Sequence, residues 1–124
     1  MAILKTYARV WSDEMDSALR PLVELVGAEC DLRFAFGDVE VAALGDFLVI
    51  AGTPEAAAKL PSASATVVVS DLEETQRLLT AHGAEITFGP AKGPTGSYFF
   101  ARHRDGAEVE YVQWTSELEN RILT

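Results

Sequence analysis

The sequence predicts an α+β fold made of two βαβββ modules in a row. A segment that begins at Ser12, SDEMDSALRPLVELVGAE, and one that begins at Ser70, SDLEETQRLLTAHGAE, share their first two and last three residues. Each has the apolar spacing of an amphipathic helix, follows one strand-like run and precedes several more. Because 124 residues are enough for one compact core and too few for two ordinary domains, we expect a single domain over residues 1–124.

The two predicted helices have clear start and stop signals. The first has apolar residues at helical spacing from Met15 and ends at Gly27, with Pro21 predicting a kink or a late start. The second has Ser70 and Glu73 spaced as a capping box and ends at Gly83.

Strand-like runs complete the two modules. One strand precedes each helix, at residues 3–11 and 64–70, and residues 30–52 supply up to three more, broken at Gly37-Asp38 and Gly45-Asp46. We therefore expect a first module over 1–52, a linker over 53–63 with a helical turn at 55–60, a second module over 64–115 and a tail over 116–124. The glycine- and proline-rich stretch 89–97 predicts a loop between two strands, and whether it acts as a lid stays open.

Composition excludes several classes of protein. The net charge of −9 repels phosphate backbones, so we expect no nucleic-acid partner. No apolar run approaches the roughly 20 residues that span a bilayer, which predicts no membrane partner. The amino terminus lacks the order of a signal peptide and Cys30 is the only cysteine, so we expect a cytoplasmic protein.

The stretch ARHRDGAEVEYVQW predicts a hairpin that fixes the register of the last two strands. A type I turn over Arg104-Asp105 with a left-handed Gly106 pairs His103 with Ala107 and Phe100 with Glu110. Alternation then assigns one face to Tyr98, Phe100, Arg102, Glu108, Glu110, Val112 and Trp114, and the helix side to Phe99, Ala101, Val109 and Tyr111.

The repeat and the ending GPAKGPTGSYFFARHRDGAEVEYV resemble the glyoxalase, bleomycin-resistance and extradiol-dioxygenase superfamily, also called vicinal oxygen chelate. Arg104 stands where the family's Asp-Pro-Asp-Gly pattern usually has proline. The resemblance covers essentially the whole chain. It implies two modules that form a U-shaped, partly open mixed-sheet cleft with helices on the outer face, usually completed in a homodimer.

The family carries up to four metal ligands, on the first and last strand of each module. Distances from the helix starts and the hairpin glycines place these positions at Tyr7, Val49, Ser64 and Glu110. Only Glu110 is a usual ligand, and a divalent metal needs at least three N or O donors. His82 lies at a helix end and His103 beside a turn, so we expect no cofactor, with a divalent metal as the weaker alternative.

The predicted site is aromatic with a few polar groups, as small-molecule sites are. Glu110 either pairs with Arg9 or Arg102 or contacts a ligand, and both interpretations stay open. Trp11 and Trp114 are rim, interface or stacking residues, and Tyr7 binds ligand or only fills space. The predicted ligand-binding residues are Tyr7, Arg9, Trp11, Val49, Ser64, Thr66, Tyr98, Phe100, Arg102, Glu110 and Trp114.

Three functions fit these observations. The first is a metal-free homodimer that binds and sequesters a small, antibiotic-like molecule, for which a cationic aromatic compound suits the acidic charge. The second is a metal-dependent lyase, isomerase or dioxygenase with Glu110 as a ligand, or a metal-free enzyme with Glu110 as general base. The third is a structural or regulatory dimer. Cys30 has no adjacent histidine or positive cluster in sequence, so no nucleophilic mechanism can be assembled.

Overall fold

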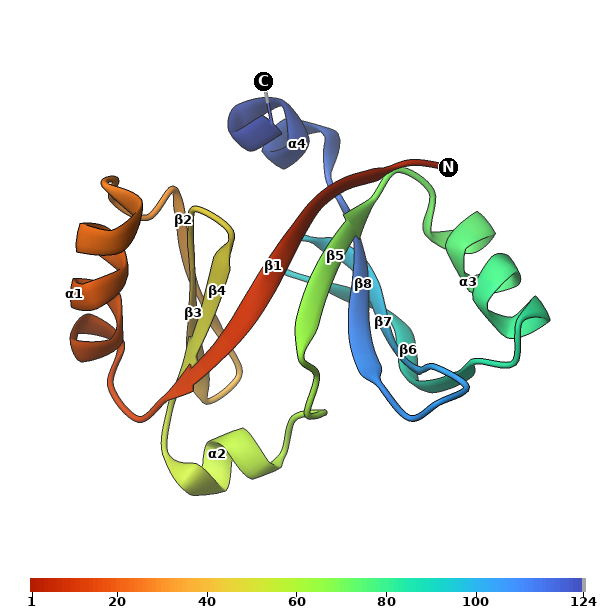
Figure 1. The fold of residues 1–124 in the computed structure, drawn as a ribbon, viewed down its shortest axis with the longest axis horizontal. Coiled ribbons are helices and arrows are strands. Elements are labelled where there is room, and N and C mark those ends of the chain that lie inside the picture. The colour runs from red at the N-terminus through yellow and green to blue at the C-terminus, as the bar shows by residue number, and fades with distance from the viewer. Residues whose placement is uncertain (124) are drawn as a thin grey trace. The chain divides into compact units, whose positions relative to one another are not determined.

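The computed structural model describes residues 1–123, which form two compact units (Figure 1). We call residues 7–61 the N-terminal unit, and residues 1–6 with 62–124 the C-terminal unit. Strand β1 (Ile3–Ser12) begins in the C-terminal unit and continues into the N-terminal one. No helix in the described range is long and apolar enough to cross a membrane.

The two units have the same order of elements and the same strand order. In the N-terminal unit β1 precedes α1 (Met15–Val26), β2 (Leu32–Phe36), β3 (Val39–Leu44), β4 (Phe47–Ala51) and α2 (Pro54–Ala58). In the C-terminal unit β5 (Ala65–Val69) precedes α3 (Leu72–Ala81), β6 (Glu85–Gly93), β7 (Gly96–Arg102), β8 (Glu108–Trp114) and α4 (Ser116–Leu123). The strand orders are β2-β3-β4-β1 and β5-β8-β7-β6, with the first strand parallel to the last in each. The predicted α+β class and the tandem βαβββ repeat are confirmed.

Both predicted helices form, with different first-turn caps. Helix α1 begins at Met15, where the Glu14 carboxylate accepts hydrogen bonds from the backbone N–H groups of Asp16 and Ser17. It continues through Pro21, and Gly27 ends it with φ 79°. Helix α3 is capped by Asp71, whose carboxylate accepts from the Glu74 N–H at 3.1 Å. The prediction of Ser70 as the cap is wrong, because the Ser70 hydroxyl accepts from the Ala2 N–H at 2.7 Å instead.

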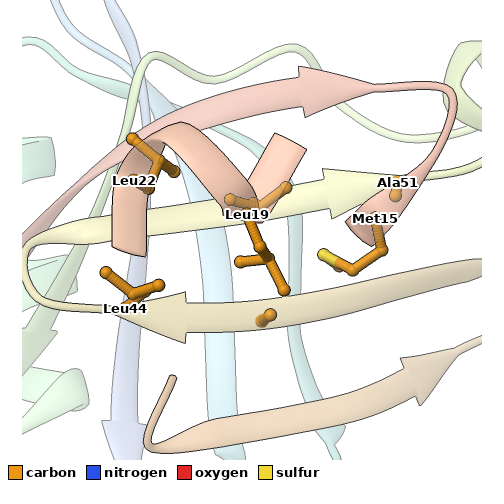
Figure 2. Packing of buried hydrophobic residues seen from close by; sticks show 7 residues of the cluster. Met15, Leu19, Leu22, Leu44 and Ala51 are labelled. Atoms are coloured by element: carbon orange, nitrogen blue, oxygen red, sulfur yellow. The ribbon is translucent and has the colours of Figure 1, made fainter. Parts of the chain in front are cut away.

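The core of the N-terminal unit lies between α1 and the strands behind it (Figure 2). Met15, Leu19 and Leu22 project from one stripe of α1 onto β3 and β4, which is the predicted apolar face. From the sheet side they meet Ala42, Leu44, Val49 and Ala51. The sequence spacing of the helix therefore decides which face of this sheet is covered.

The core of the C-terminal unit repeats this arrangement under α3. Leu72 from α3 packs with Val67 and Val69 of β5, and with Phe99, Ala101 and Tyr111 of the β7–β8 hairpin. Phe99 and Ala101 are fully buried. The helix-side set predicted from the hairpin register, Phe99, Ala101, Val109 and Tyr111, is confirmed.

Stretch 89–97 is mostly strand, so its prediction as a loop is wrong. Strand β6 runs through Gly93 and β7 begins at Gly96, which leaves a tight turn at the hairpin tip. The pairing of β6 with β7 shifts register between Ile86 and Phe88 and again between Phe88 and Ala91. Because β6 pairs only with β7 in this unit, it accommodates Pro90 and the irregularities as an edge strand can.

Two connecting segments are helical. The linker forms α2, which Thr53 caps by accepting from the Ala56 N–H at 3.1 Å. The segment expected only as a tail forms α4, in which Leu118 is buried. A short amphipathic helix of this kind gives only a weak periodic signal in the sequence.

Candidate functional site

Glu110 lies on the face of the C-terminal unit's sheet that is opposite α3, and we call this the Glu110 face. The β7–β8 hairpin sets this orientation. The His103 N–H donates to the Ala107 carbonyl at 2.7 Å, and Gly106 has φ 103°. Phe100 consequently pairs with Glu110, as predicted, and its neighbours Phe99 and Ala101 point into the helix-side core. Alternation along β8 leaves Glu110 half-buried between Val109 and Tyr111, which face α3.

A threonine hydroxyl holds the Glu110 carboxylate. Thr66 is the residue of β5 that pairs with Glu110, and its Oγ1 donates to Glu110 Oε1 at 2.7 Å. Thr66 is only 4% exposed, so this hydrogen bond is shielded from water. Ser64 directly precedes β5, is exposed, and donates its backbone N–H to the Glu108 carbonyl at 3.1 Å. Of the two predicted hydroxyl residues, Thr66 is the one that contacts Glu110.

Aromatic rings surround the carboxylate on the β7 side. Phe100 and Tyr98 are both buried, and their ring centroids lie 6.1 Å apart at 88°. Burial, with a smaller contribution from the Glu110 charge, raises the pKa of the Tyr98 phenol. Tyr98 therefore keeps its proton and stays a neutral donor beside a carboxylate.

Phe88 is a third ring of this group, and sequence reasoning missed it. Its centroid lies 6.0 Å from that of Tyr98, nearly parallel at 16°, and 6.3 Å from that of Phe100, edge-on at 81°. Ile86 packs into the helix-side core, so unbroken period-two alternation would put Phe88 on that side too. The register shift between Ile86 and Phe88 pairs Phe88 with Phe100 and turns it to the Glu110 face instead. No local pattern in the sequence indicates this shift. Treating the strand as ending at Gly89 left Phe88 beside an expected loop.

Other polar residues of this sheet have partners of their own. Arg102 forms an ion pair with Glu85 at 3.4 Å, in which both side chains are more than half exposed. Glu108 accepts from the Thr87 hydroxyl at 2.7 Å. The predicted pairing of Glu110 with Arg9 stays a prediction. Trp114 is buried near the end of β8, where it pairs with Gly96.

In the N-terminal unit, Tyr7, Arg9 and Trp11 occupy every second position of β1 and therefore share one face of the strand. Tyr7 is 1% exposed, and burial raises the pKa of its phenol strongly, with the charges of Asp31 and Asp46 adding to the effect. The Arg9 guanidinium lies 5.5 Å from the centroid of the Trp11 ring, a cation–π contact. Trp11 is exposed at 37%, in keeping with a residue near a strand end.

Val49 does not share the face of Tyr7, so its prediction as a site position is wrong. It pairs with Val10, and both pack in the cluster under α1. The hairpins differ in length: Leu44 pairs with Phe47 around a two-residue turn, whereas three residues separate His103 from Ala107. The same residue count from the hairpin glycine therefore reaches one residue too far in the N-terminal unit. A shift of one residue along a strand reverses the face on which the side chain lies. Leu48, the partner of Arg9, occupies the face that was assigned to Val49.

No protein-family model matches the sequence, and no curated protein matches it. Several solved structures are similar to this chain. An uncharacterized protein from Methanosarcina mazei is 35% identical, with 93% of this chain and 95% of that chain covered and a TM-score of 0.85. Methylmalonyl-CoA epimerase from Mycobacterium tuberculosis is 16% identical, with 95% and 93% covered and a TM-score of 0.72. A Streptomyces coelicolor methylmalonyl-CoA epimerase variant bound to 2-nitronate-propionyl-CoA is 13% identical, with 93% and 97% covered and a TM-score of 0.71.

The chain has the fold of the vicinal oxygen chelate superfamily. Its tandem βαβββ units and the hairpin that presents Glu110 are the features that carried the resemblance in the sequence. The matches to the epimerases show the fold alone, since their identity to this chain is low.

The side chains that the sequence comparison placed at the superfamily's ligand positions do not suit a divalent metal in this chain. Val49 has no donor atom and is packed in a core, while Tyr7 is a buried phenol held in its protonated form. Glu110 has one carboxylate oxygen hydrogen-bonded to Thr66. Within residues 1–123 no group of three or more His, Cys, Asp or Glu side chains is arranged to hold a metal ion.

The two histidines have structural contacts. His103 Nε2 lies 2.6 Å from the Tyr111 hydroxyl, and the two rings are stacked. His82 is the C-cap residue of α3, and its backbone N–H donates to carbonyl groups of the last turn of the helix. His82 lies at the helix end, as expected, and His103, which was expected beside a turn, contacts a core tyrosine.

Proposed function

We propose that this protein binds a small, antibiotic-like molecule at the Glu110 face without a metal, and sequesters it as a cytoplasmic homodimer. The observation that supports this most is the Glu110 carboxylate, half-buried beside Tyr98 and Phe100 and held by the Thr66 hydroxyl. A fixed carboxylate among aromatic rings suits a ligand with a cationic group or a hydrogen-bond donor.

The charge of the protein supports a cationic ligand. A net charge of −9 raises the local concentration of cations and speeds their encounter with the protein. Once a cation is bound, its contact with Glu110 occurs where Thr66, Tyr98 and Phe100 exclude water, so the attraction is weakened less by solvent than at an exposed carboxylate. The contacts predicted for Ser64, Arg102 and Trp114 belong to the same proposal. Those predicted for Tyr7, Arg9 and Trp11 stay predictions for the N-terminal unit.

Titration with a panel of cationic aromatic drugs, followed by tryptophan fluorescence, tests the proposal. The two tryptophans, Trp11 and Trp114, report binding near either unit. We expect a saturable change for part of the panel, weakened at least tenfold by Glu110→Gln. Glu117→Gln is the matched control, because it removes one exposed carboxylate from α4 of the same unit. A flat response across the panel would sink the proposal, and size-exclusion chromatography with light scattering tests the dimer.

A second function is favoured by the epimerase structures. One of them holds 2-nitronate-propionyl-CoA, an acyl-CoA analogue, on this fold. A carboxylate that Thr66 keeps in one orientation is suited to take a proton from the carbon next to a carbonyl. In that case Glu110 is a general base, or a ligand of an added metal ion whose other donors are water or substrate oxygen atoms.

Two measurements separate the two functions. Incubation with propionyl-CoA in deuterium oxide, followed by proton NMR, reveals exchange of the α-protons if Glu110 is a base. Stoichiometric metal in the purified protein that is lost in Glu110→Ala identifies a metal enzyme. Exchange or metal of this kind would replace sequestration as the function, and neither is expected of a binding protein.

A further inference from the structure

Four residues from four strands form a continuous row across the Glu110 face. Phe88 of β6 pairs with Phe100 of β7, Phe100 with Glu110 of β8, and Glu110 with Thr66 of β5. Neighbouring strands lie about 4.8 Å apart, so the Cα atoms of Phe88 and Glu110 are separated by about 10 Å. The row has a carboxylate near one end and an aromatic ring at the other, with the buried Phe100 between them.

Phe88 differs from the other rings in its exposure. Phe100 and Tyr98 are 5% and 8% exposed, whereas Phe88 is 47% exposed although both rings contact it. Tyr98 lies nearly parallel to the Phe88 ring and Phe100 meets it edge-on, so the ring is held in a defined orientation. A fixed aromatic ring that keeps half of its surface in water offers a face on which a planar group can stack.

The backbone of β6 is built around this position. The register of β6 against β7 shifts on both sides of Phe88. Gly89, with φ 86°, follows directly, and a Cβ at this position would lie 2.9 Å from the Tyr98 carbonyl oxygen. Bulges that flank a residue re-aim its side chain, and they are common beside binding sites. The irregular strand therefore directs Phe88 onto the Glu110 face next to Tyr98.

We propose that Phe88 is the stacking residue of the ligand site and that the site takes a planar, fused-ring cation. The ring system stacks on Phe88 and extends over Phe100, and the cationic nitrogen reaches the Glu110 carboxylate about 10 Å away. This inference rests on the proposed small-molecule site at the Glu110 face. It adds a residue to that site and narrows the ligand from cations in general to flat polycyclic ones.

Two dyes that share one ring system test the inference with the full-length protein. N-methylacridinium is a planar cation, and acridine at mildly alkaline pH is its uncharged counterpart. We expect Phe88→Ala to weaken both dyes about five- to tenfold, because stacking does not depend on the charge. Glu110→Gln is expected to weaken N-methylacridinium alone. The loss of dye absorbance that accompanies stacking is expected to disappear with Phe88→Ala.

Matched variants separate stacking from general damage. Leu78→Ala removes a similarly exposed apolar side chain from α3 of the same unit and should leave both affinities unchanged. Phe88→Leu keeps an apolar side chain without the ring face and should behave like Phe88→Ala, whereas Phe88→Trp should retain binding. Circular dichroism shows whether each variant folds.

The outcomes distinguish this inference from the proposed function. If Glu110→Gln weakens N-methylacridinium while Phe88→Ala and Phe88→Leu leave it within twofold of the wild type, the stacking role is overturned and the proposed site stands. If the wild type binds neither dye, the fused-ring ligand class is overturned. The proposed function fails only if the broader drug panel gives no response either.

Discussion

Replacing Thr66 by valine tests the contact on which the candidate site depends. Valine has nearly the shape of threonine but no hydroxyl, so the change removes the 2.7 Å hydrogen bond to Glu110 Oε1. A hydrogen bond to a charged group contributes about 1.5 to 3 kcal/mol. Glu110 is only half-buried, which favours the lower limit, and the added methyl at a 4% exposed position offsets up to about 0.8 kcal/mol. We expect Thr66→Val to lower the free energy of unfolding by about 1 kcal/mol.

Urea denaturation of a double-mutant cycle measures this contact directly. The cycle combines Thr66→Val with Glu110→Met, and the coupling energy should be about 1 to 2 kcal/mol. Thr66→Ser, which keeps the hydroxyl, should retain most of the coupling. Thr80→Val is the control, because its hydroxyl bonds only to backbone carbonyls within α3. A coupling energy below about 0.3 kcal/mol would refute the reasoning that Thr66 holds the carboxylate.

Four further substitutions have definite expected results. Tyr7→Phe should flatten the loss of stability at high pH: burial raises the pKa of Tyr7, so the wild type loses stability as the pH rises above about 10, by about 1.4 kcal/mol per pH unit for this group. Val49→Ala should cost about 2 kcal/mol in urea unfolding and leave ligand affinity unchanged, because Val49 packs under α1. Gly96→Ala should cost about 3 kcal/mol or more, since its Cβ would overlap the Gln113 carbonyl oxygen. Gly106→Ala, with open space around the Cβ, should cost about 1 to 2 kcal/mol.

For each of these predictions, a specific outcome would contradict the physical reason given. Parallel stability curves of Tyr7→Phe and wild type between about pH 9 and about pH 11 would show that Tyr7 does not titrate on unfolding. A loss of ligand binding in Val49→Ala without loss of stability would return Val49 to the site. Equal melting temperatures of Gly96→Ala and Gly106→Ala would contradict the close approach of β7 to β8 at Gly96.

Much of the fold followed from short-range signals in the sequence. The repeated Ser-Asp and Gly-Ala-Glu ends delimited α1 and α3, and apolar spacing identified Leu19 and Leu22 as core residues. Local chemistry also determined the β7–β8 hairpin, because a glycine in the left-handed region closes a three-residue turn in only one register. Every pairing inferred from that turn is present.

The site was only partly accessible to the same reasoning. Glu110 and Phe100 were placed correctly because they depend on one hairpin. Phe88 was missed because the bulges around it depend on how β6 fits against β7. The glycine and proline content of the stretch that follows Phe88 predicts a loop and gives no sign of this pairing. The sequence also left open which hydroxyl contacts Glu110. Ser64 and Thr66 are two residues apart in the predicted strand, and only the pairing of β5 with β8 selects Thr66.

By itself, the sequence determined the number and type of the repeated elements, the helix-facing residues of the C-terminal unit and the position of Glu110. These properties depend on residues a few positions apart, where propensity, turn chemistry and periodicity act. The tertiary structure alone decided that Val49 faces α1, that Thr66 holds Glu110 and that Phe88 joins Tyr98 and Phe100 on one face. Each of these facts depends on the register between strands, and a shift of a single residue reverses which side chains reach the site.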